Sequence, residues 1–377
     1  MNPMVNQVCT RCVMDSSAQE ITFDSAGICS FCTRFLKNSS QYIFADADLQ
    51  QARLAELVVK IKRRGRRKRY DCVIGVSGGV DSSWVLVKAV QLGLRPLAVH
   101  MDNGWNSELA QNNIANLVRS LGVDLQTHVI NWTEYKGLMQ AFFDADVIDV
   151  ELLYDNAMLA VNYRQAAKIG VRYMLSGANQ VTEGMEMPKA WAWNKFDRRN
   201  IRSIARRNRI RMVTFPSIGI VGKLWWGHVI GIQWVWFLDL LPFNKFDAMS
   251  ALQRDFGYKP YPYKHYESIF TRFYQGFILP TKFGVDKRRV HFSTLVISGQ
   301  MTRDQAIEGL RGIAYPSADA LEEDKAYFMK KMGWSQADLS NYLGRPAQPH
   351  CKYGSERRLF DLVWQIRNYF RGVAQSS

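Results

Sequence analysis

The chain has 377 residues, of which 47% are hydrophobic and 12% aromatic, so it can bury a substantial core and is long enough for two or three domains. We therefore expect a folded globular protein. Its formal net charge of +15 and pI near 9.6 favour anionic partners, among them nucleic acid, nucleotides, phosphosugars and acidic membrane surfaces. The residues before Cys9 contain no apolar segment like that of a secretory signal, and we expect a cytoplasmic protein.

Four of the six cysteines form two C-x2-C pairs near the N-terminus: Cys9, Cys12, Cys29 and Cys32. The separation between the pairs, residues 13–28, is typical of structural zinc sites, in which four thiolates close a tetrahedral shell. Disulfides and an iron–sulfur cluster are the alternatives. We interpret Cys72 and Cys351 as packing or surface residues and not as nucleophiles.

After this region the pattern predicts an amphipathic helix, a basic connector at Lys62–Tyr70, and then alternating strands and helices. Strands are expected near residues 70–76, 95–101, 125–130 and 171–176, with helices near 82–92, 108–121 and through 134–169. This order predicts an α/β fold with a doubly wound parallel sheet, whose ligands bind beyond the carboxyl ends of the strands. We interpret the basic connector as a solvated linker.

The segment S-G-G-V-D-S-S, residues 77–83, follows the first of these strands. Gly78 and Gly79 allow successive backbone N–H groups to point at one anion, and the following helix adds its partial positive end. The hydroxyls of Ser77, Ser82 and Ser83 are further donors. The spacing is neither that of a Walker A loop nor that of G-x-G-x-x-G. We expect the loop to bind a polyphosphate, with Mg²⁺ between it and Asp81; an ordinary glycine turn is the alternative.

This segment resembles the signature of the PP-loop ATP pyrophosphatases, a group that includes NAD synthetase, GMP synthetase, asparagine synthetase and tRNA-thiolating enzymes. The resemblance implies a PP-loop fold and cleavage of ATP to AMP and pyrophosphate. It places the adenine near the end of the second strand, at His100 and Asp102, and it implies further ATP or metal contacts at Gly177 and Glu183 in S-G-A-N-Q-V-T-E-G.

A closer resemblance covers nearly the whole chain. The resemblance lies in the cysteine pairs, the phosphate loop, H-M-D-N-G-W-N-S, K-F-D-R-R-N-I-R-S-I and the segment from Tyr266 to Ile307. In these segments the chain resembles the N-acetyl sugar amidotransferases of the WbpG type, from bacterial lipopolysaccharide O-antigen synthesis. This implies conversion of an acetamido group to an acetamidino group through an adenylylated intermediate. A UDP-linked diacetamido uronic acid is the substrate that the resemblance implies.

Other polar residues are candidates for contacts with phosphate or substrate. Lys282, Lys287 and Arg288 are expected to donate to phosphates as catalytic groups, unless they belong to a basic surface loop. Glu267 is expected to orient the substrate or bind metal, with a partly buried salt bridge as the alternative. Arg198, Arg199 and Arg202 are expected to bind the nucleotide diphosphate, and the alternatives are an exposed basic helix or a face that docks a partner.

The sequence shows no glutaminase nucleophile, so we expect ammonia from a separate protein. The resemblance implies a HisH-type glutaminase acting with a HisF-type subunit, and no nucleic-acid partner is expected. A PP-loop tRNA-thiolating enzyme is the main alternative function, and a zinc-dependent nucleic-acid-binding module is a second one. The oligomeric state is left open.

The most apolar stretch is Ile218–Phe243, which Lys223, His228, Gln233 and Asp239 interrupt, so we expect no membrane span there. It is either a buried core segment or an exposed helical insertion that docks the glutaminase or rests on the inner membrane surface. The predicted regions are a zinc module (1–45), a helix and linker (46–69), a PP-loop domain (70–215), an apolar insertion (216–245) and a helical C-terminal substrate or partner region (246–377).

Overall fold

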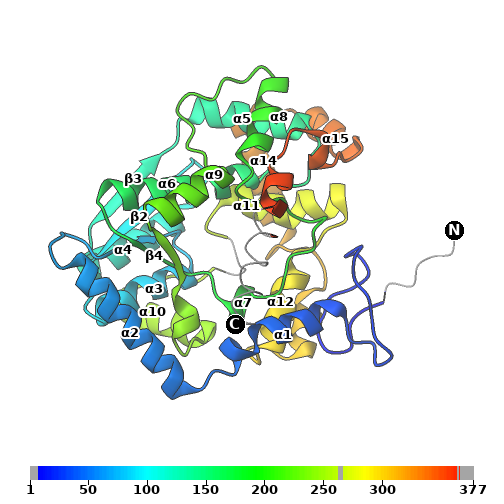
Figure 1. Ribbon diagram of the computed structural model, residues 1–377. Coiled ribbons are helices and arrows are strands. Elements are labelled where there is room, and N and C mark those ends of the chain that lie inside the picture. Colours follow the sequence, from blue (N-terminus) through cyan, green and yellow to red (C-terminus); the bar gives the residue numbers. More distant parts are fainter. Residues whose placement is uncertain (1–6, 262–265, 363–364, 366–377) are drawn as a thin grey trace.

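A computed structural model (Figure 1) describes residues 7–261, 266–362 and 365. The outer ends of the predicted 1–45 and 246–377 regions therefore lie outside the described residues. The first part of the chain contains α1 (Ser30–Ile43), α2 (Ala47–Gly65), β1 (Cys72–Gly75), α3 (Val80–Gln91), β2 (Pro96–Asp102), α4 (Glu108–Leu121), β3 (Leu125–Val129), α5 (Trp132–Asp144), α6 (Leu152–Lys168), β4 (Tyr173–Ser176), α7 (Gln180–Glu183) and α8 (Arg198–Arg207).

The second part of the chain adds one strand and is otherwise helical in the described residues. Its elements are α9 (Ile220–Leu224), the π-helical turn η1 (Trp225–Val229), β5 (Gln233–Trp236), the 3-10 turn η2 (Phe237–Leu240), α10 (Lys245–Phe256), α11 (Ile269–Phe273), the π-helical segment η3 (Tyr274–Phe283), α12 (Arg288–Ile297), α13 (Arg303–Gly309), α14 (Ala318–Met332), α15 (Gln336–Gly344) and the 3-10 turn η4 (His350–Lys352).

The five strands form one parallel sheet in the order β3-β2-β1-β4-β5. The chain moves from β1 through β2 to β3 in one direction and returns to add β4 and β5 on the other side of β1. The order therefore reverses between β1 and β4, which is the topological switch point where sheets of this kind bind ligands. The predicted α/β fold with a doubly wound parallel sheet is confirmed.

Helices cover both faces of the sheet, because alternate residues of each buried strand point to opposite sides. One face packs with α5 and α6 and contains Val73, Leu97, Val99, Met101 and Met174. The other face packs with α2, α3, α4 and α10 and contains Cys72, Ile74, Ala98, Tyr173 and Leu175. Figure 1 shows these two helical layers on either side of the strands.

Local sequence fixes the ends of the helices around the sheet. The Ser107 side chain accepts a hydrogen bond from Ala110 N at the start of α4, and Gly122 ends the helix with a φ of 61°. The Asp46 side chain likewise accepts from Leu49 N at the start of α2, whose last turn carries Lys62 and Arg63 near the negative end of the helix dipole. The basic run therefore completes a helix before it enters the connector.

The apolar stretch Ile218–Phe243 is part of the sheet and its core. The expectation of a helical segment was wrong for residues 233–236, which form β5 and pair in parallel with β4. Phe237 and Leu238 of η2 are fully buried, whereas Val221 and Trp225 are 68% and 53% exposed. The segment thus combines an edge strand, a buried 3-10 turn and an exposed helical turn, because its β-branched and aromatic residues fit the open edge of β4.

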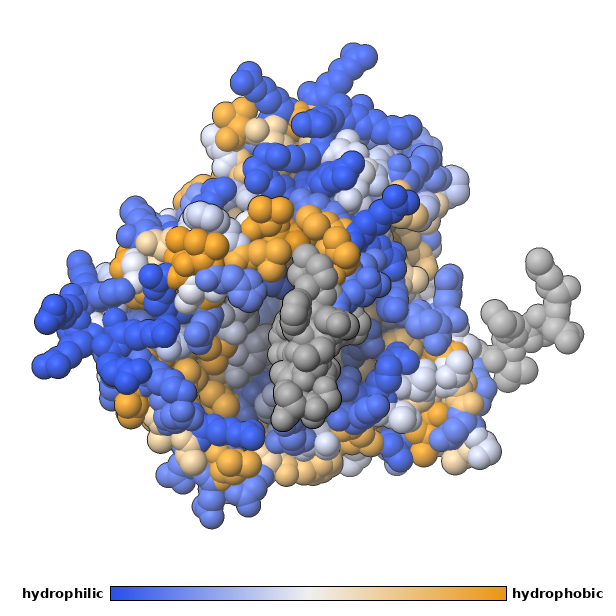
Figure 2. Space-filling model, in the orientation of Figure 1, coloured by the Kyte–Doolittle hydropathy of each residue, from blue (hydrophilic) through white to orange (hydrophobic). Residues whose placement is uncertain are grey.

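Among the described residues, no helix has the length and apolar character needed to cross a membrane. Figure 2 shows an apolar patch in the region where α9 lies in Figure 1. Val221 in α9 and Val229 in η1 are exposed.

Candidate active site

A cavity of about 660 Å³ opens at the switch point of the sheet. Residues that follow β1 line one side, among them Ser77, Gly79, Asp81 and Ser82. Residues 175–178 at the end of β4 line the adjacent side. The phosphate loop predicted from the sequence therefore lies where a parallel sheet with this strand order is expected to bind its ligand.

The phosphate loop, residues 77–83, is held by its own serines. Ser77 N donates to Ser82 Oγ at 3.3 Å, Gly79 N donates to Ser77 Oγ at 3.3 Å, and the two hydroxyl oxygens lie 3.2 Å apart. Gly78 has a φ of +87°, and a Cβ there would lie 2.8 Å from Ala110 O. Gly78 and Ser83 shape the loop and the start of α3, but neither lines the cavity.

The first turn of α3 directs its backbone N–H groups toward this loop. Gly79 is the N-cap residue and provides no side-chain cap, so the first N–H groups of the helix are not satisfied in the usual way by an N-cap side chain. An anion at this position would interact with the partial positive charge of the helix end. The local structure thus supports the predicted binding of phosphate.

Gly177 allows the end of β4 to approach the loop. A Cβ at this position would lie 2.8 Å from Ser82 N and 3.2 Å from Asp81 Cβ, so any larger residue would force the end of β4 away from the first turn of α3. Gly177 was predicted as an ATP contact, and the structure places it in the cavity wall.

Three predicted carboxylates, those of Asp81, Glu183 and Glu267, line the cavity. Glu183 ends the short helix α7, and the Glu267 carboxylate lies close to Gly79. Among the described residues, the cysteines near the N-terminus are the one group of three or more potential ligands already gathered around a point. The carboxylates would therefore hold Mg²⁺ singly or in pairs, with phosphate oxygens completing its shell, which is the usual arrangement for this ion.

The cavity also contains aromatic and basic residues that the sequence analysis did not select. Lys245, Tyr258, Tyr261 and His291 line it, and the Tyr261 hydroxyl donates to Gly78 O at 3.2 Å. Burial, together with Tyr261, Glu267 and Asp81, raises the pKa of Tyr258. No motif identifies these residues, since they come from loops and helices far from the phosphate loop in sequence.

His100 and Asp102 do not line the cavity, whereas Val99 and Met101 of the same strand do. His100 is buried; its Nδ1 lies 2.9 Å from Val76 O and its Nε2 3.0 Å from Asn106 Nδ2. Asn106 Nδ2 also donates to Asp102 Oδ1 at 3.2 Å. Because strand side chains alternate, these two residues support the loop from the opposite face.

The structure places the three predicted catalytic cations outside the cavity, in ion pairs and contacts with carbonyl groups. Lys282 Nζ donates to Tyr342 O at 2.5 Å and pairs with Asp146 at 3.1 Å. Lys287 pairs with Glu151 at 2.6 Å, and Arg288 pairs with Asp286 at 2.8 Å. These side chains neutralise carboxylates of the protein itself, so the structure does not support their assignment as donors to phosphate.

Arg198, Arg199 and Arg202 lie on α8 and line a second cavity of about 510 Å³. None of them lines the first cavity. The predicted substrate residues are thus divided, since Glu267 lies beside the phosphate loop and the arginines lie elsewhere.

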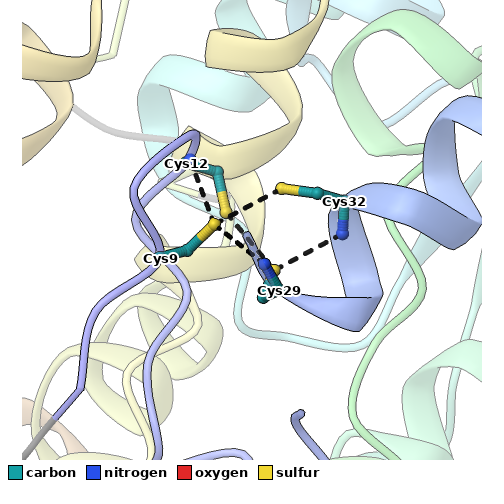
Figure 3. Close-up of side chains that lie close together, drawn as sticks. All are labelled: Cys9, Cys12, Cys29 and Cys32. Carbon is teal, nitrogen blue, oxygen red and sulfur yellow. Dashed lines mark hydrogen bonds between the residues drawn. The ribbon is translucent and has the colours of Figure 1, made fainter. Parts of the chain in front are cut away.

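The four N-terminal cysteines converge as predicted for a metal site (Figure 3). Their sulfur atoms all lie within 4.8 Å of one another, with Cys9–Cys32 and Cys12–Cys29 separations of 3.7 and 3.8 Å. A tetrahedral zinc ion with Zn–S bonds of about 2.3 Å requires S–S separations of about 3.8 Å. Backbone N–H groups of Cys29 and Cys32 donate to sulfur at 3.2 and 3.4 Å. The residues therefore fit a closed structural zinc site.

The two other cysteines do not line the cavity. Cys351 is exposed, whereas Cys72 is fully buried in β1. Burial raises the pKa of the Cys72 thiol, which keeps it protonated at neutral pH.

Residues 267–368 match the family model described as LPS biosynthesis protein WbpG-like, C-terminal domain. This part of the chain is similar to that domain, and we refer to residues 267–368 as the WbpG-like domain. The match confirms the resemblance that the sequence predicted for this region. No curated protein shows significant similarity to the chain.

Three solved structures show weak similarity to the chain. The NH3-dependent NAD synthetase from Campylobacter jejuni subsp. jejuni NCTC 11168, in complex with the nitrate ion, is 13% identical over 44% of this chain and 75% of that chain, with a TM-score of 0.28. NMN synthetase from Francisella tularensis is 12% identical over 59% of this chain and 99% of that chain, with a TM-score of 0.30. A 4-thiouridine synthetase–RNA complex with bound ATP is 19% identical over 50% of this chain and 42% of that chain, with a TM-score of 0.29. At these values the similarity says nothing about the activity of this chain.

The WbpG-like domain supplies one wall of the first cavity. Its lining residues are Glu267, His291, Phe292, Leu295 and Met301. Four of these five lie on or just after α12, which faces the phosphate loop across the cavity. The domain is therefore part of the same site as the loop.

The cysteine module also packs on the WbpG-like domain. Arg303 Nε donates to Cys12 O at 3.1 Å and its Nη2 to Cys9 O at 3.0 Å, while Arg289 pairs with Asp15 at 3.0 Å. Val13 N donates to Ser293 Oγ at 3.2 Å. The metal-binding loop thus supports α12, the helix that lines the cavity (Figure 1).

Proposed function

We propose that the protein is an ATP-dependent amidotransferase that converts an acetamido group of a nucleotide-linked sugar to an acetamidino group in lipopolysaccharide synthesis. One observation carries the proposal: the phosphate loop and the WbpG-like domain form opposite walls of one cavity. A volume of about 660 Å³ lies within the usual range for small-molecule sites. The loop suits ATP, and the domain's family name supports a role in polysaccharide synthesis.

The reaction needs an activated amide, because ammonia does not attack an ordinary amide. The amide oxygen attacks the α-phosphorus of ATP and pyrophosphate leaves. Ammonia then adds to the amide carbon, and AMP departs with the original oxygen, which leaves the amidine. Each step requires positioned donors for phosphate and a site that holds both reactants close together.

The residues of the cavity match these needs. Ser77, Ser82 and the first N–H groups of α3 would hold the leaving pyrophosphate. Asp81 and Glu267, with Glu183 nearby, offer carboxylate oxygens for Mg²⁺, which would neutralise charge on the phosphates. Tyr258, Tyr261 and Phe292 provide aromatic surface for the adenine or the sugar ring.

Ammonia would come from a separate glutaminase of the HisH type with its HisF-type partner. Neither Cys72 nor Cys351 lines the cavity, and Cys72 is fully buried, so neither supports an internal glutaminase. The same observation weighs against a tRNA-thiolating enzyme, because none of the described cavity residues is a cysteine that could carry sulfur.

The function is tested by incubating the purified protein with ATP, Mg²⁺, ammonium and a panel of UDP-linked N-acetylated sugars. We expect release of AMP and pyrophosphate that depends on the sugar, and a product in which NH replaces one oxygen, as measured by mass spectrometry. Omission of ammonium is the matched control, because it prevents amidine formation. ATP cleavage that requires tRNA, with no change in any sugar, would contradict the proposal.

A further inference from the structure

The second cavity, which we term the arginine pocket, lies between α8 and two other segments. Its basic wall consists of Arg198, Arg199, Arg202 and Arg206, and its other lining residues are Ser203, Gly219, Val221, Gly222, Gly354 and Glu356. It shares no residue with the first cavity. The surface at the top of Figure 2, where α8 lies in Figure 1, is largely hydrophilic.

The arginine pocket carries a large excess of positive charge. Arg198, Arg202 and Arg206 are spaced four residues apart on α8 and share one side of the helix. Glu356 is the single carboxylate in the lining, and its Oε2 already accepts a hydrogen bond from Ile220 N at 2.6 Å. Four guanidinium groups thus face one carboxylate that is engaged by the backbone.

Within residues 7–261 and 266–362, none of these four arginines forms an ion pair or donates a side-chain hydrogen bond. Other arginines of the chain are bound: Arg95 pairs with Asp71 at 2.6 Å, and Arg303 donates to two carbonyl groups of the cysteine module. The contrast matters because a charge cluster kept for stability would be expected to include its own counter-charges.

Arg198 shows most clearly that the counter-charge in the arginine pocket is insufficient. Its Nε is buried and has no hydrogen-bond partner among the described residues. Burial, with repulsion from Arg202 and Arg164, lowers the pKa of Arg198, although Glu356 opposes this shift. A buried guanidinium donor without an acceptor is unfavourable, and a bound anion would relieve both the missing hydrogen bond and the repulsion.

The walls of the arginine pocket are held in place by buried polar contacts. Asp197 caps α8 by accepting from Asn200 N at 2.9 Å, and the same oxygen accepts from Glu356 N at 3.0 Å. Asn200 Nδ2 donates to Gly354 O at 3.3 Å, and Gly354 N donates to Ser203 Oγ at 2.9 Å. These contacts join α8 to residues 354–356, so the backbone of the two walls is preorganised for a ligand.

The arginine pocket is linked to the first cavity through α6. Asp155 lines the first cavity, and the next residue, Asn156, exchanges hydrogen bonds with the backbone of Ile218 at 2.6 and 3.0 Å. Ile218 precedes Gly219, which lines the arginine pocket. The two sites therefore lie on either side of one short buried segment, although each has its own lining.

We propose that the arginine pocket is a second anion site, separate from the ATP site, that binds the diphosphate group of a nucleotide. The guanidinium group of arginine donates two parallel hydrogen bonds to a pair of phosphate oxygens. Several arginines on one side of a helix can therefore bind a compact polyanion. The concave shape, about 510 Å³, admits a nucleoside diphosphate and favours it over a duplex or a flat membrane surface. The choice of a uridine nucleotide rests on the proposed function; the diphosphate itself rests on the arginines.

The test measures the binding of UDP to the full chain by calorimetry, with the first cavity saturated by a non-hydrolysable ATP analogue and Mg²⁺. The variant is Arg198→Gln with Arg202→Gln. The matched control is Arg66→Gln with Arg67→Gln, which removes the same charge from exposed arginines that line neither cavity. Both variants are first compared with the parent protein by thermal unfolding.

We expect UDP to bind in the presence of the analogue, with a Kd that rises at least about tenfold in the α8 variant and less than about twofold in the control. Equal effects of the two variants, competition between UDP and the analogue, or unchanged binding by the α8 variant would each overturn the proposal. So would α8-dependent binding to phosphatidylglycerol vesicles or RNA without binding of UDP. UDP binding without amidine formation would contradict only the proposed function.

Discussion

The carboxylate of Glu267 lies so close to the backbone of Gly79 that a Cβ on this glycine would collide with Oε1. Gly79 is the N-cap of α3 in the phosphate loop, and Glu267 is the first residue of the WbpG-like match. The two parts of the site therefore meet at a position where any side chain on residue 79 would require the Glu267 carboxylate to move. This relationship makes Gly79 a test of whether the two walls act together.

Gly79→Ala should reduce pyrophosphate release at least about 100-fold, because the new methyl group would displace Glu267 or the loop. Its φ of −82° is accessible to alanine, so the fold should persist. Gly344→Ala is the control, since a Cβ there meets nothing within 4 Å. Normal pyrophosphate release by Gly79→Ala, measured with a coupled phosphate assay, would show that the Glu267 contact is unimportant.

Asp81→Asn should lower the rate of ATP cleavage at least about 100-fold. The loss of a carboxylate weakens the binding of Mg²⁺, and the leaving pyrophosphate then loses charge stabilisation. Raised Mg²⁺ should restore part of the activity. Asp319→Asn, on the exposed surface of α14, removes the same charge and should have no effect. Turnover by Asp81→Asn close to that of the parent protein would remove Asp81 from the site.

Lys282→Met should destabilise the protein by about 1–3 kcal/mol without a matching loss of turnover in the folded fraction. The reason is that the Lys282 side chain is only 1% exposed, and its loss removes the donor to the carbonyl oxygens of Tyr342 and Arg345. Asp146 loses one of its two cationic partners and keeps its ion pair with Arg345. Chemical denaturation gives the free energy of unfolding, and active-site titration gives the folded fraction. Loss of turnover with normal stability would restore the catalytic role predicted from the sequence.

These lysines show which part of the site the sequence could predict. The phosphate loop and the cysteine pairs are local patterns, so Ser77, Asp81 and the four cysteines could be placed from spacing and backbone geometry alone. Lys282 and Lys287 depend on Asp146 and Glu151, more than a hundred residues earlier in the chain. A basic run has the same appearance whether its partners are phosphates or distant carboxylates, and only the folded chain distinguishes them.

The same distinction between local and distant contacts explains why four strands of the sheet were predicted and β5 was not. The first four strands alternate with helices and were predicted close to their observed bounds, because their apolar runs are separated by clear helical patterns. β5 lies within a continuous apolar stretch, where the periodicity of hydrophobic residues does not distinguish a strand from a helix. Its pairing with β4 decides its conformation, and that contact is not local.

Zinc removal should lower the melting temperature by at least about 5 °C and weaken the support of α12. Arg303 and Arg289 hold the backbone of the cysteine module against the WbpG-like domain, so its loss should loosen one wall of the cavity. Cys9→Ser should have the same effect, while Cys351→Ser, at an exposed cysteine, should not. Metal analysis should find one zinc ion per chain; iron, or no metal in active protein, would contradict the assignment.

The last prediction concerns pH and His350, which is buried and stacks on Trp193 with ring centroids 5.0 Å apart. Its Nδ1 donates to Asn200 Oδ1 at 2.8 Å, and its Nε2 accepts from Asp149 N at 3.1 Å. These partners fix a neutral tautomer, because a proton on Nε2 would face a backbone N–H. Burial lowers the pKa of His350 from 6.5 to about 4, although Asp149 opposes this shift.

The unfolded chain therefore binds a proton at His350 between pH 6.5 and 4 while the folded chain does not, so this residue's contribution to stability is lost as the pH falls through that window. Asp239 acts in the opposite direction: burial raises its pKa from 3.8 to about 6, so its contribution to stability is lost as the pH rises.

The pH dependence of the stability of the parent protein combines the effects of His350 and Asp239. The difference in unfolding free energy between the parent protein and His350→Gln isolates the histidine, and urea unfolding at several pH values measures it. We expect that difference to shrink by on the order of 3 kcal/mol between pH 7 and pH 4. A difference that is constant with pH would show that His350 is protonated equally in the folded and unfolded chains.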